Sequence, residues 1–353
     1  MAYCTPVQRD AFLGDLGAAQ RAARAGIIPS RATAVDNTWK LWSTFCQDLR
    51  VDPWLSTVED PVSLLQVFGE RYRTGEIAPH RHIVRSRTVE GALRAIGQTF
   101  SSVGSRDPRL TPFGKTEFRI RRQLTGYAKQ DPPPNRAKPI PYAVLHHILH
   151  LALAHGTAEA LAVADMIITA FFFLLRPGEY SEPNAENKPF HLNDVQFHIG
   201  GRRITAMLAT EHDLISATFV TLEFTDQKNS VRGEVVGLAR SGNPYMCPVV
   251  SVSRRVQHLR QHNAPSNTPL CGYYRADGVL RFVKPSDITT TLRFSVAALG
   301  PALGFLPGDV SARSLRAAGA MALLCAHVDG NSIRLLGRWC SIPVLRYRES
   351  RSR

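Results

Sequence analysis

A proline-rich segment at residues 131–141 most strongly limits how this chain can fold. Its sequence, DPPPNRAKPIP, places five prolines in eleven residues. Proline lacks a backbone N–H and clashes with the preceding helical turn, so the segment can lie neither inside a helix nor in a central strand. We therefore predict that it is a linker between two domains. A chain of 353 residues is long enough for both, since a domain typically takes ~100–200 residues.

The sequence before the linker predicts a small helical domain at residues 31–130, preceded by a flexible, at most partly helical arm at residues 1–30. Apolar residues recur there at intervals of three and four, which is the spacing along one face of a helix. Four stretches show this pattern: 33–49, 60–68, 88–100 and 112–127. We expect a helix in each.

The sequence after the linker changes its periodicity twice, which predicts an α+β domain at residues 142–353. Helical patterns come first, apolar and polar residues then alternate as in strands, and helical patterns return. The expected helices are 142–154, 157–175, 248–262, 286–299, 314–325 and 331–337. The expected strands are 195–199, 203–207, 218–224 and 235–238, in a small antiparallel sheet. The whole chain is therefore expected to be mostly helical.

The charge balance points to a polyanionic partner. The 43 Lys and Arg residues outnumber the 29 Asp and Glu residues, for a net charge of +14. Residues 1–130 carry 19 basic and 12 acidic side chains and residues 131–353 carry 24 and 17, so each part contributes +7. Both domains are thus expected to contact the same polyanion.

Three further features indicate that this partner is DNA or RNA rather than a membrane. The longest apolar run, Met166–Leu175, has ten residues, and a helix needs ~20 to cross a bilayer; we expect it to be a buried core helix. The first 16 residues lack the pattern of a secretory signal. The six cysteines form no CxxC pair, which argues against a disulfide framework or a zinc site and fits a reducing compartment.

Two arginine clusters are candidates for phosphate chemistry. Arg176 directly follows the apolar run and needs an anionic partner if it is buried. Glu179 could orient it for function or form a purely structural pair with it. Arg313 and Arg316 lie at the start of an expected helix, with Ser311 as the expected N-cap. Free N–H groups and basic side chains there would bind phosphate, although a solvated helix start has the same pattern.

A lysine and a tyrosine complete the set. Lys228 lies in the turn of an expected hairpin, within QKNSVRGEV, and by itself is typical of a solvated turn. Tyr347 lies close to the C-terminus, after the run LLGRW that ends at Trp339. On its own such a tyrosine indicates an aromatic residue that packs a terminal helix.

Taken together, the order Arg, Lys, Arg-x-x-Arg, Trp, Tyr resembles the tyrosine recombinase (phage integrase) family over residues 30–353. The runs QKNSVRGEV, GRW and LRYR look most like its Crypton-type branch in eukaryotic mobile elements. The resemblance implies a core-binding domain with a SAM-like helical fold, followed by a recombinase catalytic domain. It also implies recombination or integration of double-stranded DNA by a mobile element, a tetrameric synapse on DNA, and a nuclear location in a eukaryote or a cytoplasmic one otherwise.

The resemblance also implies roles for individual residues. Tyr347 would attack a phosphodiester and form a 3′-phosphotyrosine. Arg176 and Arg316 would hold the nonbridging oxygens, and Lys228 would protonate the departing 5′ oxygen. Trp339 would seat the phosphate. No metal or cofactor is required, and the sequence has no EF-hand, HExxH or Walker motif.

Two departures from the family pattern affect these expectations. Arg313 stands where the family has a histidine, and a guanidinium cannot act as a base near neutral pH. Arg338 lies nine residues before Tyr347, a common family spacing, but Trp339 matches the family's residue type. We therefore expect Trp339 to be the site residue.

Six basic residues are expected to contact DNA away from the reacting phosphate: Arg119, Arg121, Arg122, Lys129, Arg338 and Arg346. Because both domains are basic, we expect them to close on opposite faces of the duplex. Two alternatives stay open. One is a non-catalytic DNA-binding protein with the same fold, and the other is an activity like that of a type IB topoisomerase.

Overall fold

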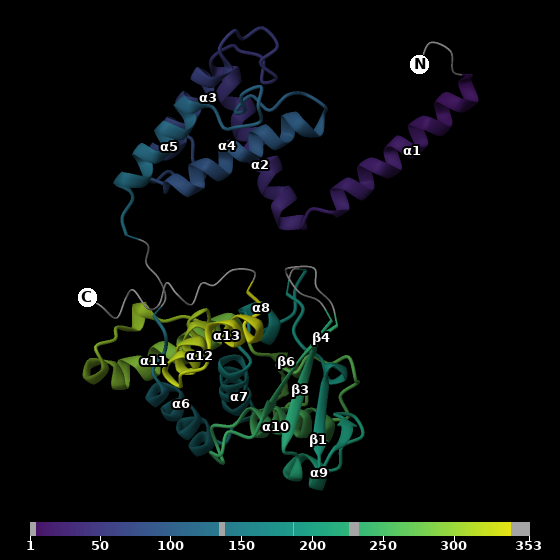
Figure 1. The fold of residues 1–353 in the computed structure, drawn as a ribbon, viewed down its shortest axis with the longest axis vertical. Coiled ribbons are helices and arrows are strands. Elements are labelled where there is room, and N and C mark those ends of the chain that lie inside the picture. The colour runs from purple at the N-terminus through teal and green to yellow at the C-terminus, as the bar shows by residue number, and fades with distance from the viewer. Residues whose placement is uncertain (1–4, 134–137, 186, 226–232, 340–353) are drawn as a thin grey trace. The chain divides into compact units, whose positions relative to one another are not determined.

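The computed structural model describes residues 5–133, 138–185, 187–225 and 233–339. The chain divides into two compact units, residues 1–134 and 135–353, each with its own apolar core. The division falls inside the proline-rich segment. Figure 1 shows the elements of both units. No helix in the described part of the chain is long and apolar enough to cross a membrane.

In the described part of the first unit, the regular elements are all helices, and one isolated β-bridge joins Leu110 and Thr116. Its helices are α1 (Pro6–Ala25), α2 (Pro29–Asp48), α3 (Pro61–Thr74), α4 (Ser86–Ser102) and α5 (Phe118–Gln130). The core lies between α2, α3 and α4, where the rings of Trp42, Phe45 and Phe68 pack tilted or edge-to-face with centroids 5.4–5.6 Å apart. These rings come from the stretches whose periodicity predicted the helices.

Two segments of this unit differ from the sequence expectation. The arm expected at residues 1–30 is largely the 20-residue helix α1, because alanine and arginine favour helix even without a covered face. The helix expected from Pro112 begins instead at Phe118. Pro112 and Gly114 suit a tight turn rather than a helix interior. The Glu117 side chain then caps α5 by accepting a hydrogen bond from the Arg119 N–H at 2.6 Å.

The second unit is a helical body with a small antiparallel sheet, as expected. Its helices are α6 (Tyr142–His155), α7 (Ala158–Phe172), α8 (Pro177–Tyr180), α9 (Glu211–Ser216), α10 (Pro248–Gln261), α11 (Pro285–Leu303), α12 (Ser314–Cys325) and α13 (Gly330–Leu336). Short 3-10 turns lie at Leu192–Asp194 and Pro307–Asp309. Helix α7 is at the centre and contacts α6, α10, α11 and α12. Every residue of α7 from 162 to 171 is buried, which confirms that the apolar run lies in the core. The helix ends at Phe172, however, and the buried residues 173–175 lie beyond it, with Leu174 at a φ of 52°.

The main sheet has the order β2-β1-β3-β4. Its strands are β1 (Val195–Ile199), β2 (Arg202–Thr205), β3 (Phe219–Phe224) and β4 (Glu234–Ala239). All neighbours are antiparallel, and Phe197 lies opposite Ile204 on one side and Val220 on the other. A second pair, β5 (Gly272–Tyr274) and β6 (Leu280–Phe282), was not predicted from the sequence. Strands of three residues are too short to show an alternating pattern.

The start of α12 differs in detail from the expectation. The helix begins at Ser314, but Arg313 rather than Ser311 occupies the N-cap position. Ser311 takes part through its backbone: its carbonyl accepts from the Ser314 N–H at 2.8 Å, and its own N–H donates to the Ser314 hydroxyl at 3.2 Å. Backbone hydrogen bonds therefore close this turn.

Candidate active site

Arg176 lies between the end of α7 and the start of α8, where Glu179 holds it in two ways. The Arg176 backbone N–H donates to Glu179 Oε2 at 2.7 Å, and the Nη1 atom of its guanidinium donates to Oε1 at 2.9 Å. The Arg176 side chain remains 27% exposed. Glu179 therefore fixes the orientation of Arg176 and still leaves part of the guanidinium open to a ligand.

Arg338 approaches the same carboxylate from the C-terminal end of α13. Its Nη2 atom lies 3.1 Å from Glu179 Oε2, and the guanidinium also donates to the carbonyls of Phe173 and Leu174 at 3.4 and 3.3 Å. It lies 3.8 Å from the ring centre of Phe224, and the side chain is only 1% exposed. The sequence predicts that Arg338 contacts DNA, whereas in this structure its guanidinium is enclosed by protein.

Arg316, on the first turn of α12, faces the end of α13. Its Nη2 atom donates to the carbonyl of Gly337, and its guanidinium carbon lies 5.2 Å from the ring centre of Trp339. Trp339, and not Arg338, is therefore the residue that contacts a predicted phosphate-binding arginine. The Nε atom of Arg316 is buried without a hydrogen-bond partner within the described structure.

The charges around Arg316 are not balanced. Burial, and then the positive charge of Arg176, lower the pKa of Arg316 to about 9; Glu179 acts in the opposite sense and Arg338 adds to the lowering. Glu179, the carboxylate that acts on Arg316, is already bound by Arg176 and Arg338. Such a site favours a ligand with oxyanion charge.

Close helix packing brings Arg316 to Arg176. At Gly319, one turn after Arg316, an added Cβ would lie 2.1 Å from the carbonyl oxygen of Phe171 and 2.5 Å from Leu174 Cδ2. Only glycine lets α12 approach the end of α7 this closely. The run Ala317-Ala-Gly-Ala320 in the sequence is the signal that could have indicated this close contact.

A buried tyrosine ties the two arginine segments together. Tyr180, at the end of α8, is fully buried, and its hydroxyl donates to the carbonyl of Ala312 at 2.9 Å. Ala312 directly precedes Arg313, so this hydrogen bond links the Arg176 turn to the start of α12. The sequence does not indicate a role for Tyr180, since nothing near it points to a partner more than a hundred residues away.

The other predicted catalytic residues are placed only in part. Arg313 is exposed at the N-cap of α12. Lys228, Arg346 and Tyr347 lie outside the described residues. Strand β3, which leads toward Lys228, ends at Phe224, and the Phe224 ring lies against Arg338.

The basic residues of α5 fall into two groups. Arg119 is paired with Asp60 at 2.6 and 2.9 Å and with Glu117 at 3.3 Å, so its charge is already compensated. Arg121 and Arg122 are exposed and lie 5.7 and 5.8 Å from the ring centre of Phe118. Lys129 is exposed as well.

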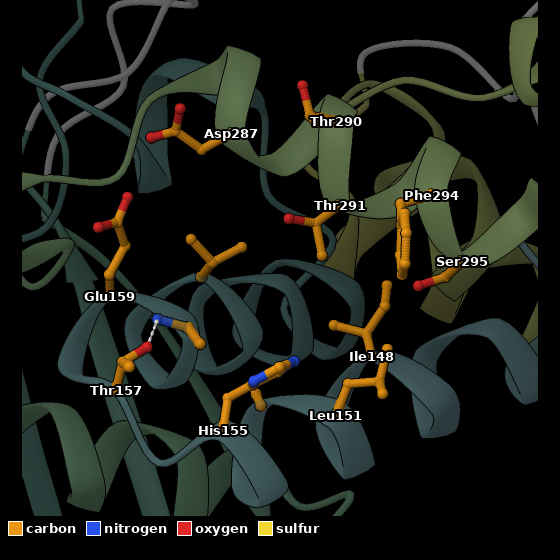
Figure 2. Close-up of a pocket in the computed structure, with 13 residues that line it drawn as sticks. Ile148, Leu151, His155, Thr157, Glu159, Asp287, Thr290, Thr291, Phe294 and Ser295 are labelled. Atoms are coloured by element: carbon orange, nitrogen blue, oxygen red, sulfur yellow. Dashed lines mark hydrogen bonds between the residues drawn. The ribbon is translucent and has the colours of Figure 1, made fainter.

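A separate pocket of about 580 Å³ lies in the second unit, between α6, the start of α7 and α11. Figure 2 shows it, with Phe294 and Thr291 of α11 facing Ile148 and Leu151 of α6. None of the predicted site residues lines it. The described part of the chain also has no group of three or more His, Cys, Asp or Glu residues arranged to hold a metal.

Comparison with known proteins shows the fold. No family model matches the sequence, and no curated protein matches it. Among solved structures, the Tn1549 transposon integrase in complex with circular-intermediate DNA has a TM-score of 0.53 at 12% identity, over 94% of this chain and 92% of that one. The same integrase with transposon right-end DNA has a TM-score of 0.46 at 11% identity, over 82% and 80%.

The fold of this chain is therefore that of an integrase. The second unit has the mostly helical architecture, with a small antiparallel sheet, of an integrase catalytic domain. One solved protein that shares this fold is the Tn1549 transposon integrase.

Proposed function

We propose that this protein cleaves and rejoins DNA strands as a tyrosine recombinase, in the recombination or integration of a mobile element. The observation that carries the proposal is the meeting of Arg176, Arg316 and Trp339 around Glu179 and Arg338. These residues come from segments far apart in the sequence. They meet in a chain with the fold of a transposon integrase that was solved with DNA.

The cluster has the properties of a phosphate site. Arg176 is partly exposed and held by Glu179, and Arg316 keeps a buried Nε without a partner in the described structure. Guanidinium groups bind the two nonbridging oxygens of a phosphodiester without changing protonation. A phosphate at this place would supply the anionic charge that the three arginines lack.

The proposed reaction is a transesterification. Tyr347 loses its phenol proton to water, and the phenol oxygen attacks phosphorus. The bond from phosphorus to the 5′ oxygen breaks, and its electron pair stays on that oxygen. Lys228 gives the departing oxygen a proton. Rejoining is the reverse, with a 5′ hydroxyl of a DNA strand as the attacking group. The roles of Tyr347 and Lys228 are supported by their order in the sequence relative to the two arginines.

Arg313 is the reason to keep a second candidate function. An exposed arginine at a helix start can bind phosphate, but it cannot take the proton of a tyrosine near neutral pH. A protein with this substitution could retain DNA binding and lose turnover. The second candidate is therefore a non-catalytic DNA-binding protein with the integrase fold.

Covalent trapping separates the two candidates. The protein is incubated with a pool of nicked duplexes of randomised sequence. The short fragment released by cleavage diffuses away, so that the strand cannot be rejoined and any covalent 3′ adduct accumulates. Denaturing gels detect the adduct, and peptide mass spectrometry locates the modified residue. The recombinase proposal requires an adduct on Tyr347 that is lost in Tyr347→Phe. DNA binding by both proteins without an adduct would favour the non-catalytic candidate.

We also propose three finer features of this function. They are self-association into a tetrameric synapse on DNA, closure of the two domains around the duplex, and descent from the Crypton-type branch. The equal charge of +7 on both parts of the chain supports a duplex held by both. The runs GRW and LRYR support the Crypton-type assignment.

A further inference from the structure

A tight turn in the first unit presents an almost fully exposed phenylalanine. The Gly114 N–H donates to the Thr111 carbonyl at 3.0 Å, and the Thr111 N–H donates to the Lys115 carbonyl at 2.8 Å. Gly114 has a φ of 73°. This is a type I turn followed by a left-handed glycine, a common three-residue hairpin loop. Phe113 lies at the tip and is 88% exposed.

The base of this turn is rigid. Asp107, only 7% exposed, accepts hydrogen bonds from the Arg109 backbone N–H at 2.9 Å and from its guanidinium at 2.6 Å. The pair lies against Gly97 of α4, where an added Cβ would be 2.3 Å from Asp107 Oδ1. The Glu117 N–H donates to the Arg109 carbonyl at 2.8 Å. The turn therefore holds Phe113 out from the core in a defined place.

Folding does not explain the choice of phenylalanine at position 113. Turn positions favour residues such as Pro and Gly for backbone reasons, and Pro112 and Gly114 follow that rule. A phenylalanine at the tip contributes no burial and leaves a large apolar group in water. Residues that break a local rule without a folding gain are concentrated at functional positions.

Basic residues follow Phe113 closely in the sequence. Lys115 follows it in the turn and is exposed, and Arg121 and Arg122 lie over the ring of Phe118, which is itself 55% exposed. Within the described residues, no carboxylate pairs with any of these three cations. The two acids nearest in sequence, Asp107 and Glu117, are bound to Arg109 and Arg119. An exposed ring among unpaired cations suits a polyanion better than an apolar protein surface.

On this basis, and resting on the DNA binding proposed above, we propose that Phe113 is an apolar wedge that enters a groove of duplex DNA while Lys115, Arg121 and Arg122 bind the neighbouring phosphates. Apolar side chains inserted between base steps unstack them in part and kink the duplex. Phe113 would thus bend the DNA that the first unit holds, without reading its sequence.

The test uses the full chain and a short random-sequence duplex with a fluorescent donor and acceptor at its ends. Anisotropy gives the affinity, energy transfer gives the bend, and mass photometry gives the number of proteins per duplex. We expect Phe113→Ala to weaken binding roughly tenfold and to return energy transfer toward that of free DNA. Phe113→Leu, which keeps an apolar wedge, should retain most of the bend.

The matched control is Phe294→Ala, which removes another exposed phenylalanine (65% exposed) in the second unit and should change neither signal. If Phe113→Ala binds and bends the duplex as the wild type does, the wedge proposal is wrong and the proposed function is unaffected. A lower number of proteins per duplex with an unchanged bend would also overturn it, because Phe113 would then contact a second copy. A wild-type chain that binds no duplex at low salt would overturn the proposed function and the wedge with it.

Discussion

The Nη2 atom of Arg338 lies 3.1 Å from the Oε2 atom of Glu179, so two groups 159 residues apart form an enclosed ion pair. The other carboxylate oxygen of Glu179 accepts from Arg176 at 2.9 Å. Glu179 thus joins an arginine that is shut off from solvent to one that is open to a ligand. Because Arg338 points into the protein, the next residue, Trp339, is the one that meets Arg316.

We expect Arg338→Met to lower the free energy of unfolding by about 3 kcal/mol, because removing one partner of a buried ion pair leaves the other charge poorly compensated. Urea denaturation of the chain measures the change. The control is Arg281→Met, since Arg281 forms an exposed pair with Asp277 at 3.7 Å and should cost under about 1 kcal/mol. Similar losses in the two variants would show that the Arg338 pair is not the stabilising contact inferred above.

Gly319→Ala should destabilise the protein by about 1–3 kcal/mol, as overpacking a closely packed interior does. The added methyl would lie 2.1 Å from a backbone oxygen of α7, so α12 must move and carry Arg316 with it. Thermal unfolding measures the loss. Gly330→Ala, at the start of α13, meets nothing within 4 Å and should leave the midpoint unchanged. A wild-type midpoint for Gly319→Ala would contradict this packing.

A bound oxyanion should stabilise the second unit through Arg316, and this stabilisation should decrease at high pH. Burial and the charge of Arg176 lower the pKa of Arg316 to about 9. The folded state therefore holds this proton less tightly than the unfolded chain. Below about pH 9 the buried positive charge lowers the free energy of unfolding, and this loss of stability is relieved as the pH rises through that value. A bound anion offsets this cost only while Arg316 is charged.

We therefore expect sulfate to raise the thermal midpoint near neutral pH, relative to chloride at equal ionic strength, and to raise it less above about pH 9. The gain should reach about 1.4 kcal/mol when sulfate is at ten times its dissociation constant. Arg316→Gln should abolish the sulfate effect, whereas Arg281→Gln, on an exposed strand residue, should keep it. An equal effect of sulfate on both variants would place the anion elsewhere.

Arg176→Ala and Arg316→Ala should each slow formation of the covalent adduct by roughly 10²–10³, which corresponds to ~2.7–4 kcal/mol of transition-state stabilisation. Duplex affinity should change far less, because each variant removes only one of many phosphate-binding residues. Adduct rates and binding constants are measured on the same nicked duplex. Equal losses in rate and affinity would mark both residues as ordinary DNA-positioning groups.

Arg313→His should raise the rate of adduct formation near neutral pH, since an imidazole can accept the proton of Tyr347 where a guanidinium cannot. In the wild type, we expect the rate to rise with pH toward the ordinary tyrosine pKa of ~10, because proton loss is left to water. The substitution should flatten this profile. If the rate stays unchanged or falls, Arg313 has a role of its own in this protein.

Much of the architecture followed from local patterns. The proline-rich segment lies where the chain divides into two units, because proline excludes regular structure wherever it is clustered. Helix α12 has the predicted bounds Ser314–Cys325, and the apolar run of α7 is buried as expected. Where the signal was mixed, as at residues 112–117, turn residues prevailed over apolar spacing and the helix began later.

What the sequence determined by itself was therefore which elements form and which residue types could bind phosphate. The tertiary structure alone decided which of them meet. Arg338 and Trp339 are neighbours in the sequence, yet one is enclosed with Glu179 and the other lies beside Arg316. That choice depends on the close contact at Gly319 and on the Tyr180–Ala312 hydrogen bond. Periodicity records only which face of an element is apolar, whereas the partner of a buried charge is set by packing between elements that are distant in the chain.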